Sequence, residues 1–255
     1  SLIAEYPSSS LLCSGKNVGL SDGIMGNSEV GHMNIGAGRV VFQNLKKIDN
    51  AIKDGSLVEN KTLLRVLKRV KNNKSTLHIT GLLSDGGVHS QLSHLFALIE
   101  MAEKFGLNSI MIHGILDGRD TPPDSGLDFV NKLQTFISGK KNVKIASLCG
   151  RFYAMDRDTR WDRVEKAYRL YTEGRGAIFS DPGDAVTDSY NRKIYDEFLE
   201  PVILSDETKK PHGIMKSGDG MIFFNFRADR AREITHALTD PEFMNFKRPC
   251  LPLFS

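Results

Sequence analysis

The sequence predicts an α/β fold, a three-layer sandwich built around a mainly parallel sheet. Apolar runs typical of buried strands alternate with amphipathic helical segments, in the order 75–83, 91–106, 109–116, 124–137, 143–150 and 161–174. The segments between the strands are long enough for crossover helices, and such crossovers are almost always right-handed. The order strand, helix, strand, helix, strand therefore favours one parallel sheet covered by helices on both faces.

Two helical segments precede this pattern. Residues 42–55 place Leu45, Ile48 and Ile52 on one helical face. A second helix is expected from about residue 60 to residue 71, with an apolar stripe of Leu63, Leu64, Leu67 and Val70. Both segments should bury one face against a core.

The helices between the strands each show one apolar face. The first buries Leu92, Leu95 and Ile99, and the second is expected to start with Asp124 as its N-cap. Further along, residues 180–220 follow a less regular pattern.

The last regular elements are a further buried strand at 221–226 and a helix at 228–238. They follow the less regular segment and add to the α/β pattern.

The composition excludes several classes of protein. With 255 residues the chain can bury a full core, as one large domain or as one domain plus a piece of another. Lysine and arginine exceed aspartate and glutamate by only three, 34 against 31, which is too balanced for a nucleic-acid-binding surface. No apolar run approaches the roughly 20 residues of a membrane-spanning helix, and no signal peptide is recognisable. We therefore expect neither nucleic acid nor a membrane as a partner.

The cysteines and the chain ends carry two further expectations. Cys13, Cys149 and Cys250 are odd in number, far apart and in no metal-ligand spacing, so a reduced cytoplasmic compartment is expected rather than a disulfide framework. The chain starts without methionine and stops in the apolar segment PCLPLFS. These ends are typical of an excised or proteolysed fragment of a longer protein.

Polar, glycine-containing motifs follow the predicted strands. They are SDGGVHS, LDGRDTPP, CGRFYAMDRD and FNFRADRAR. Because the carboxyl ends of parallel strands meet at one edge of a sheet, the four loops should line one crevice. The candidate site residues in these loops are His89, Arg119, Asp120, Arg151, Arg157, Arg227 and Arg230.

This set of side chains is suited to a small polyanion. Planar guanidinium groups bind carboxylate and phosphate through paired hydrogen bonds, and here five arginines face one or two acids. His89 and Asp120 are the groups that can move protons. Isolated histidines are more often structural, and we expect that role for His78, His94 and His113.

Residues 19–39, GLSDGIMGNSEVGHMNIGAGR, are rich in glycine, and their apolar residues fit neither a strand nor an ordinary helix. Ser28 lies among them, beside Asn27, Glu29 and His32. Its spacing favours a turn or helix-cap serine. The alternative is a nucleophile on a tight loop, with Asn27 and backbone amides stabilising an oxyanion. Since neither a G-x-S-x-G elbow nor a Walker A motif is present, the residues alone leave this choice open.

Five longer motifs occur in the order in which one enzyme family carries them. They are MGNSEVGHMNIGAGRVV, SDGGVHS, HGILDGRDTPP, GRFYAMDRDTRWDRVEKAY and FFNFRADRAREI. Together they resemble the signature segments of cofactor-independent (2,3-bisphosphoglycerate-independent) phosphoglycerate mutases, over residues 12 to about 246. Five long motifs in register make this resemblance highly specific.

The resemblance implies an isomerase of the alkaline phosphatase superfamily. Such enzymes interconvert 3-phosphoglycerate and 2-phosphoglycerate in glycolysis and gluconeogenesis through a phosphoserine intermediate, and are usually cytoplasmic monomers. They combine a phosphatase-like domain, which holds two manganese ions (Mn²⁺), with an inserted transferase domain. Residues 1–42 would be a remnant of the first domain, and residues 43–255 most of the α/β transferase domain.

The resemblance also implies roles for individual residues. Ser28 would take the phosphoryl group and coordinate one metal ion, and Asp120 would act as base or acid toward the glycerate hydroxyls, with His89 nearby. The family's substrate-binding set corresponds here to His89, Arg119, Asp120, Arg151, Arg157, Arg227 and Arg230. The other metal ligands and an active-site lysine are expected outside this chain. By itself the chain is therefore expected to be inactive and to bind manganese weakly at most.

Two other functions stay open. One is a phosphatase or sulfatase of the same superfamily, in which water resolves the phosphoserine. The loops that grip glycerate argue against it, since a hydrolase has no need to retain its alcohol product. The other is a non-catalytic anion-binding module, which the presence of Ser28 and Asp120 disfavours.

Overall fold

The computed structural model describes residues 5–20, 23, 25–26 and 28–248, apart from the side chain of Glu29. Asn27 and Cys250, both considered above, lie outside the described residues. The chain forms two compact units, the first up to Leu57 and the second from Val58 onward.

The first unit contains a 3-10 helix, η1 (Gly15–Val18), and two α-helices, α2 (Ser28–Ala37) and α3 (Asn44–Lys53). The expectation that residues 19–39 hold no ordinary helix is wrong, because α2 lies within them. Among the described side chains of α2, only Val30 is buried. The helix therefore has no apolar stripe by which a sequence pattern could reveal it.

Polar contacts of Asn34 help to hold α2 in place. The Asn34 amide donates to the carbonyl oxygens of Val18, at 3.1 Å, and Val30, at 2.8 Å. Its side-chain oxygen accepts from the backbone N–H of Val41 at 2.6 Å. One half-buried asparagine thus joins three segments of the first unit.

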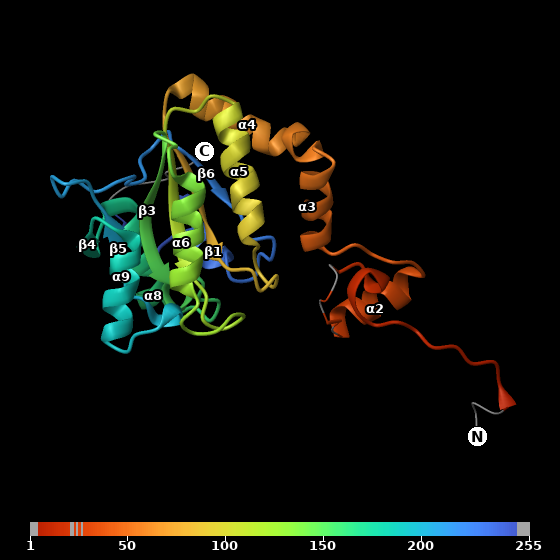
Figure 1. Ribbon diagram of the computed structural model, residues 1–255. Helices are drawn as coiled ribbons and strands as arrows, with labels where there is room; N and C mark the ends of the chain where they lie inside the picture. The colour runs from red at the N-terminus through yellow and green to blue at the C-terminus, as the bar shows by residue number, and fades with distance from the viewer. Residues whose placement is uncertain (1–4, 21–22, 24, 27, 249–255) are drawn as a thin grey trace. The chain divides into compact units, whose positions relative to one another are not determined.

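The second unit is built around a six-stranded sheet with the order β4-β5-β3-β2-β1-β6 (Figure 1). The strands are β1 (Leu77–Leu83), β2 (Ile110–Leu116), β3 (Val143–Gly150), β4 (Ala177–Phe179), β5 (Val202–Leu204) and β6 (Gly220–Phe223). β6, β1, β2 and β3 are parallel, whereas β5 pairs antiparallel with β3 and parallel with β4. The predicted α/β fold with a mainly parallel sheet is confirmed.

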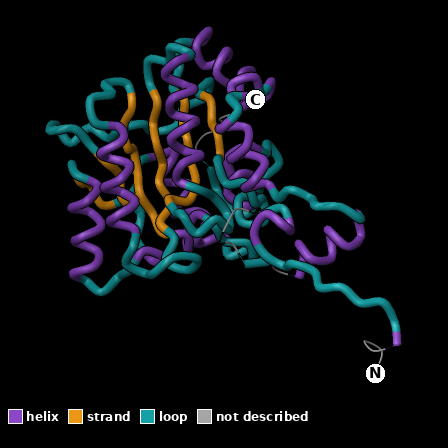
Figure 2. The backbone as a smooth tube through the Cα atoms, turned by 45° about the vertical axis from the view of Figure 1, so that its right-hand side comes forward, coloured by secondary structure: helices purple, strands orange, loops and turns teal. Residues whose placement is uncertain are grey.

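Helices cover both faces of this sheet, as Figure 2 shows. They are α4 (Lys61–Asn73), α5 (Leu92–Lys104), α6 (Gly126–Ile137), α7 (Arg151–Ala154), α8 (Trp161–Glu173), α9 (Pro182–Asn191) and α10 (Arg232–Thr239), with the 3-10 turns η2 (Ser56–Glu59) and η3 (Asp196–Phe198). One core contains buried side chains of α4, α5, α6 and α9, and a second contains those of α7, α8 and α10. The two cores give the three layers.

The pairing of β2 with β3 contains one irregularity. Ile112 lies opposite Ile145, but the next residue, His113, lies opposite Ser147, so β3 holds one extra residue at Ala146. As a result Ile145 and Leu148, three positions apart, belong to the same core, although side chains of a regular strand alternate between its faces.

A chain of polar side chains crosses the buried sheet. Ser147 Oγ lies 2.7 Å from His113 Nδ1, His113 Nε2 lies 2.9 Å from His78 Nδ1, and His78 Nε2 lies 3.1 Å from Asp219 Oδ2. A proton on Nε2 of each ring lets each group donate to the next, from serine to aspartate. Burial, together with the neighbouring His78, holds the pKa of His113 well below its usual range. These histidines have the structural role expected of them.

Residues 180–220, whose sequence pattern is less regular, contain α9, η3 and β5. The expectation for Asp124 is wrong: α6 begins at Gly126, its N-cap position is Ser125, and no Ser125 side-chain hydrogen bond caps it.

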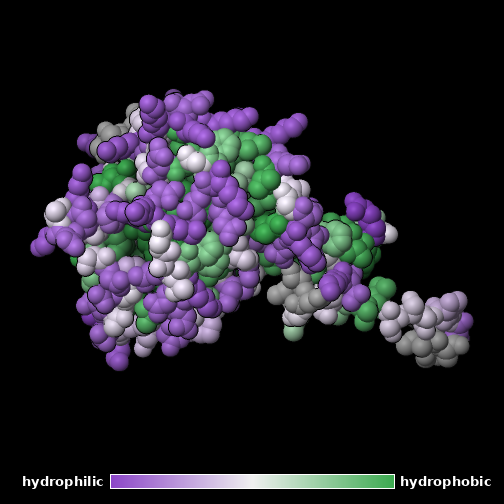
Figure 3. Space-filling model, turned by 45° about the horizontal axis from the view of Figure 1, so that its top comes forward, coloured by the Kyte–Doolittle hydropathy of each residue, from purple (hydrophilic) through white to green (hydrophobic). Residues whose placement is uncertain are grey.

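One face of the molecule illustrates the character of its surface. That face is mostly hydrophilic, with its hydrophobic residues gathered in separate patches (Figure 3). Among the described residues, no helix combines the length and the apolar character needed to cross a membrane.

Candidate anion site at the carboxyl end of the sheet

The candidate residues lie in the loops that follow four parallel strands. His89 is in the loop after β1, and Arg119 and Asp120 are in the loop after β2. Arg151 is the first residue of α7, directly after β3, and the loop after β6 carries Arg227 and Arg230. Since these strands are parallel, their carboxyl ends share one edge, and the contacts below join all four loops.

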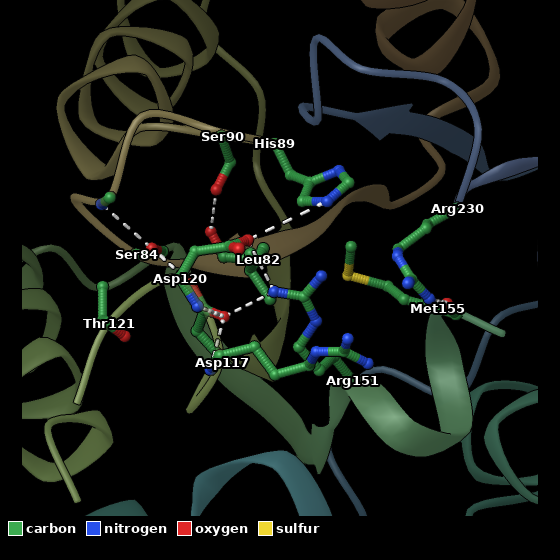
Figure 4. A network of polar contacts seen from close by, with 12 residues as sticks. Leu82, Ser84, His89, Ser90, Asp117, Asp120, Thr121, Arg151, Met155 and Arg230 are labelled. Atoms are coloured by element: carbon green, nitrogen blue, oxygen red, sulfur yellow. Dashed lines mark hydrogen bonds and ion pairs between the residues drawn. The ribbon is translucent and has the colours of Figure 1, made fainter. Parts of the chain in front are cut away.

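The centre of the site is a buried arginine between two aspartates (Figure 4). Arg151 Nη1 lies 2.5 Å from Asp117 Oδ1 and 2.7 Å from Asp120 Oδ2, and the Arg151 side chain is only 3% exposed. Burial lowers the pKa of Arg151, but the hydrogen bonds to Asp120 and Asp117 outweigh it and raise that pKa. Arg151 therefore stays charged and fixes the position of Asp120.

Asp117 is a site residue that sequence reasoning missed. Its carboxylate is 1% exposed and accepts from Ser84 Oγ at 2.7 Å and from the backbone N–H groups of Arg119 and Asp120, at 3.2 and 3.0 Å. It thus shapes the loop after β2 and holds Arg151 at once. Its one sequence signal is an acidic residue placed directly after a strand.

His89 lies between two carboxylates. Its Nε2 is 3.8 Å from Asp120 Oδ2, and its Nδ1 is 3.8 Å from Asp229 Oδ1. Its carbonyl oxygen accepts from the backbone N–H of Phe226 at 2.8 Å, which ties the loop after β1 to the loop after β6. Burial and the charge of Arg151 lower the pKa of His89 to about 4, although Asp120 and Asp229 oppose the shift. The imidazole is therefore neutral at pH 7.

Asp229, which sequence reasoning also missed, positions two arginines. Its Oδ2 accepts from Arg157 Nη1 at 2.9 Å, and its Oδ1 lies 3.2 Å from Arg227 Nε. Burial raises the pKa of Asp229, but the hydrogen bond from Arg157 and the charge of Arg227 outweigh it and lower that pKa. Arg157 and Arg227 remain 46% and 49% exposed, so both can also reach a ligand.

The remaining two arginines complete the positive surface. Arg230 Nη1 donates to the carbonyl oxygen of Met155 at 3.1 Å, and Arg119, 51% exposed, lies 3.5 Å from Glu197. Burial lowers the pKa of Arg230, and so do the nearby charges of Arg157, Arg151 and Arg119. Such mutual repulsion is relieved by a bound anion.

Ser28, in contrast, belongs to the first unit. It is exposed at the first position of α2, with Oγ 3.3 Å from His32 Nδ1, and the Ser28 carbonyl oxygen lies 2.7 Å from the same nitrogen. The structure thus brings together all seven candidates of the second unit, and describes Ser28 within the first.

The donor set for manganese is incomplete in the part of the chain that the structure describes. Within that part, no group of three or more His, Cys, Asp or Glu side chains is placed to hold a metal ion. The described residues therefore do not fit the pair of Mn²⁺ ions that the resemblance implies.

Comparison with known protein families decides the relationship. A family model described as "BPG-independent PGAM N-terminus" matches residues 48–253. The chain belongs to this family. It is 48% identical over 252 residues to the 2,3-bisphosphoglycerate-independent phosphoglycerate mutase of Clostridium novyi and, over the same length, to that of Myxococcus xanthus. Each alignment covers 99% of this chain and 49% of the relative, so the chain spans about half the length of these relatives.

A solved structure supports the same relationship. The Leishmania mexicana phosphoglycerate mutase, crystallised at low cobalt concentration, matches with a TM-score of 0.87 and 37% sequence identity. The match covers 95% of this chain and 46% of the Leishmania chain. Membership of the phosphoglycerate mutase family thus rests on both sequence and fold.

Proposed function

We propose that this chain supplies the phosphoglycerate-binding part of a 2,3-bisphosphoglycerate-independent phosphoglycerate mutase, an isomerase that interconverts 3-phosphoglycerate and 2-phosphoglycerate. The observation that carries the proposal is the cluster of five arginines around Asp120 in a chain of this family. Phosphoglycerate carries a carboxylate and a phosphate, and both groups match guanidinium geometry.

Substrate binding would use the exposed arginines. Arg119, Arg157 and Arg227 are each about half exposed and can turn toward a ligand, while buried Arg151 stays with its aspartates. Charge on the transferring phosphoryl oxygens would be neutralised by the same groups. Arg230, already crowded by like charges, would gain most from an anion.

Proton transfer would use Asp120 and His89. Asp120 is held by Arg151 and lies 3.8 Å from His89, so one carboxylate oxygen is fixed where a glycerate hydroxyl can approach. Neutral His89 can donate or accept a hydrogen bond to the same hydroxyl without adding charge.

The phosphoryl acceptor would be Ser28. In the first half-reaction Ser28 Oγ loses its proton and binds phosphorus, the bond between phosphorus and the glycerate oxygen breaks, and that oxygen takes a proton. In the second, the other glycerate hydroxyl gives its proton to Asp120 and binds phosphorus, the bond between phosphorus and Ser28 Oγ breaks, and the serine oxygen regains a proton. Retention of glycerate between these steps distinguishes a mutase from a hydrolase.

The wider assignments of the family belong to the same proposal. Residues 1–42 would be part of a phosphatase-like domain and residues 43–255 part of a transferase domain of the alkaline phosphatase superfamily. Manganese would be bound by Ser28 together with further ligands from outside the described residues. A cytoplasmic, monomeric enzyme of glycolysis and gluconeogenesis is proposed, with neither nucleic acid nor a membrane as partner.

Calorimetric titration of the chain with 3-phosphoglycerate tests the binding site. We expect Arg157→Ala and Arg227→Ala each to weaken binding by roughly 10- to 100-fold, since each removes a charge-assisted hydrogen bond. Arg192→Ala is the matched control, because Arg192 follows α9, pairs with Asp188 of that helix and with Glu200, and lies in none of the four loops that carry the site. Equal affinities for all four proteins would contradict the proposed site.

Turnover by the complete enzyme tests the chemistry. Ser28→Ala should abolish conversion of 3-phosphoglycerate to 2-phosphoglycerate in a coupled assay, because no oxygen remains to accept the phosphoryl group. Release of inorganic phosphate in place of 2-phosphoglycerate by the wild-type enzyme would instead indicate a phosphatase.

A further inference from the structure

The 3-10 turn η3 lies against both loops that carry the central residues of the anion site. Three glycines, Gly118, Gly126 and Gly150, pack against it, and a Cβ atom on any of them would collide with the turn. At Gly150 a Cβ would lie 2.1 Å from the carbonyl oxygen of Glu197, and at Gly118, where φ is +69°, it would lie 2.8 Å from the Glu197 nitrogen. Arg151 and Arg119 directly follow these glycines. The backbone of η3 therefore sets how closely the two loops approach.

Asp196, the first residue of η3, is fully buried and bonded on three sides. Its Oδ2 accepts from the backbone N–H of Gly126 at 2.7 Å, and its own backbone N–H donates to the carbonyl oxygen of Pro123 at 3.0 Å. Its Oδ1 accepts a short hydrogen bond from the Tyr190 hydroxyl. Asp196, 70 positions further along the chain, thus caps the N-terminus of α6, where the Ser125 side chain makes no capping hydrogen bond.

These contacts lead directly to the reacting groups. Residues 117–126 form one loop, with Asp117 and Asp120 near its start and Gly126 at its end, and Asp196 is bonded to its second half. The end of the turn holds the other loop, since the Gly150 N–H donates to the carbonyl oxygen of Leu199 at 2.7 Å. One turn therefore ties together the loops of Asp120 and Arg151.

We propose that Asp196 is a positioning residue of the anion site, which fixes the loop of Arg119 and Asp120 relative to Arg151 through η3. The proposal rests on the proposed function, because the site it organises is the phosphoglycerate site. Asp196 does not touch the ligand. It acts by holding backbone that would otherwise shift, and displacements of about 1 Å at a site can cost roughly 100-fold in rate.

The surroundings of Asp196 decide which variants are informative. The titratable groups that face it are Tyr190 from α9 and Asp124 and Asp117 from the loop after β2. Asparagine can replace it with both hydrogen bonds kept, since its oxygen can accept from Gly126 while its amide donates to the tyrosine oxygen. Alanine loses both. Asp196→Asn should therefore keep the loop after β2 in position, whereas Asp196→Ala should not.

Titration of the 255-residue chain with 3-phosphoglycerate tests the proposal. We expect Asp196→Ala to weaken binding about 10-fold or more and Asp196→Asn to restore affinity to within about 3-fold of wild type. Asn60→Ala is the matched control, because Asn60 caps α4 by accepting from the backbone N–H groups of Thr62 and Leu63, and its loss removes a helix cap outside the four loops that carry the site. This control should bind as wild type does.

Amide hydrogen exchange gives a second readout that needs no ligand. Residues 118–126 and 150–155 should exchange faster in Asp196→Ala than in wild type, and normally in Asn60→Ala and Asp196→Asn. If Asp196→Ala binds 3-phosphoglycerate normally while Arg157→Ala does not, the positioning role is wrong and the proposed function stands. A wild-type chain that binds no 3-phosphoglycerate overturns both.

Discussion

Replacing Arg151 with methionine removes the charge at the centre of the site and keeps a side chain of similar length. The guanidinium lies between Asp117 Oδ1 and Asp120 Oδ2, at 2.5 and 2.7 Å, with the arginine 3% exposed. We expect this single change to destabilise the fold as well as weaken anion binding, because it leaves a carboxylate buried without its counter-charge.

The size of the loss follows from the two partners. Removing one member of a buried ion pair costs about 3–5 kcal/mol. Asp120 is 21% exposed and can turn toward water, whereas Asp117 is 1% exposed and cannot. Asp117 keeps its hydrogen bonds from Ser84 and from two backbone N–H groups, so we expect a value near the lower end, ~3 kcal/mol. This is a large share of the roughly 5–15 kcal/mol by which domains are stable.

Urea unfolding, followed by circular dichroism at pH 7.5, measures the loss. Arg160→Met is the control, since Arg160 is 47% exposed and pairs with exposed Asp158, and surface pairs of this kind contribute about 0–1 kcal/mol. Its second partner, the buried Asp156, would keep Arg163 and two backbone N–H groups. Adding Asp117→Asn to Arg151→Met should recover at least about 1 kcal/mol, because the buried charge is then absent. The reasoning is refuted if Arg151→Met costs no more than Arg160→Met, or if the double variant is less stable than Arg151→Met alone.

Three further outcomes are expected from buried titratable groups. The folded-state pKa of His113 is lowered well below 6.5, so the unfolded chain binds the proton more tightly and stability should fall as pH drops below about 6.5. His113→Gln, which can still donate to His78, should flatten a plot of unfolding free energy against pH by up to about 1.4 kcal/mol per pH unit. An unchanged slope would contradict this expectation. Burial raises the pKa of Asp196 to about 6, so this group stabilises the fold below about pH 4, and that contribution is lost as pH rises through 6. The stability advantage of Asp196→Asn over wild type should therefore be larger at pH 8 than at pH 4. A difference in urea midpoints that does not change with pH would count against this. Burial also raises the pKa of the Cys149 thiol to about 12, whereas Cys13 is exposed; iodoacetamide at pH 8 should label Cys13 in the native chain and Cys149 only in urea, which peptide mass spectrometry can check.

The sheet and the arginine cluster could be predicted from the sequence because both depend on local patterns. Strands β1, β2 and β3 are mostly apolar runs, and parallel strands necessarily place the loops that follow them at one edge. The clustering of Arg119, Arg151 and the other site arginines can therefore be predicted without knowing any side-chain contact.

The residues that hold this cluster in place could not be predicted in the same way. Asp229 acts on Arg157 across 72 positions, and Asp196 caps a helix that begins 70 positions earlier. Each is a single acid in a polar loop, so nothing local separates it from a surface residue. Helix α2 was missed for a related reason, since polar contacts of Asn34 hold it where an apolar stripe would have been recognised.

The extra residue at Ala146 decides where β3 can change length. Deleting Ala146 would leave an uninterrupted ladder to β2 with every following side chain on its present face, because Ile145 and Leu148 would then lie two positions apart. Deleting a residue further along, at Leu148 for example, would instead put Cys149 in the place of Leu148 and move the start of α7, with Arg151, out of register. Viable deletions within β3 in descendants of this sequence should accordingly fall at Ala146, even where other side chains of the strand vary freely.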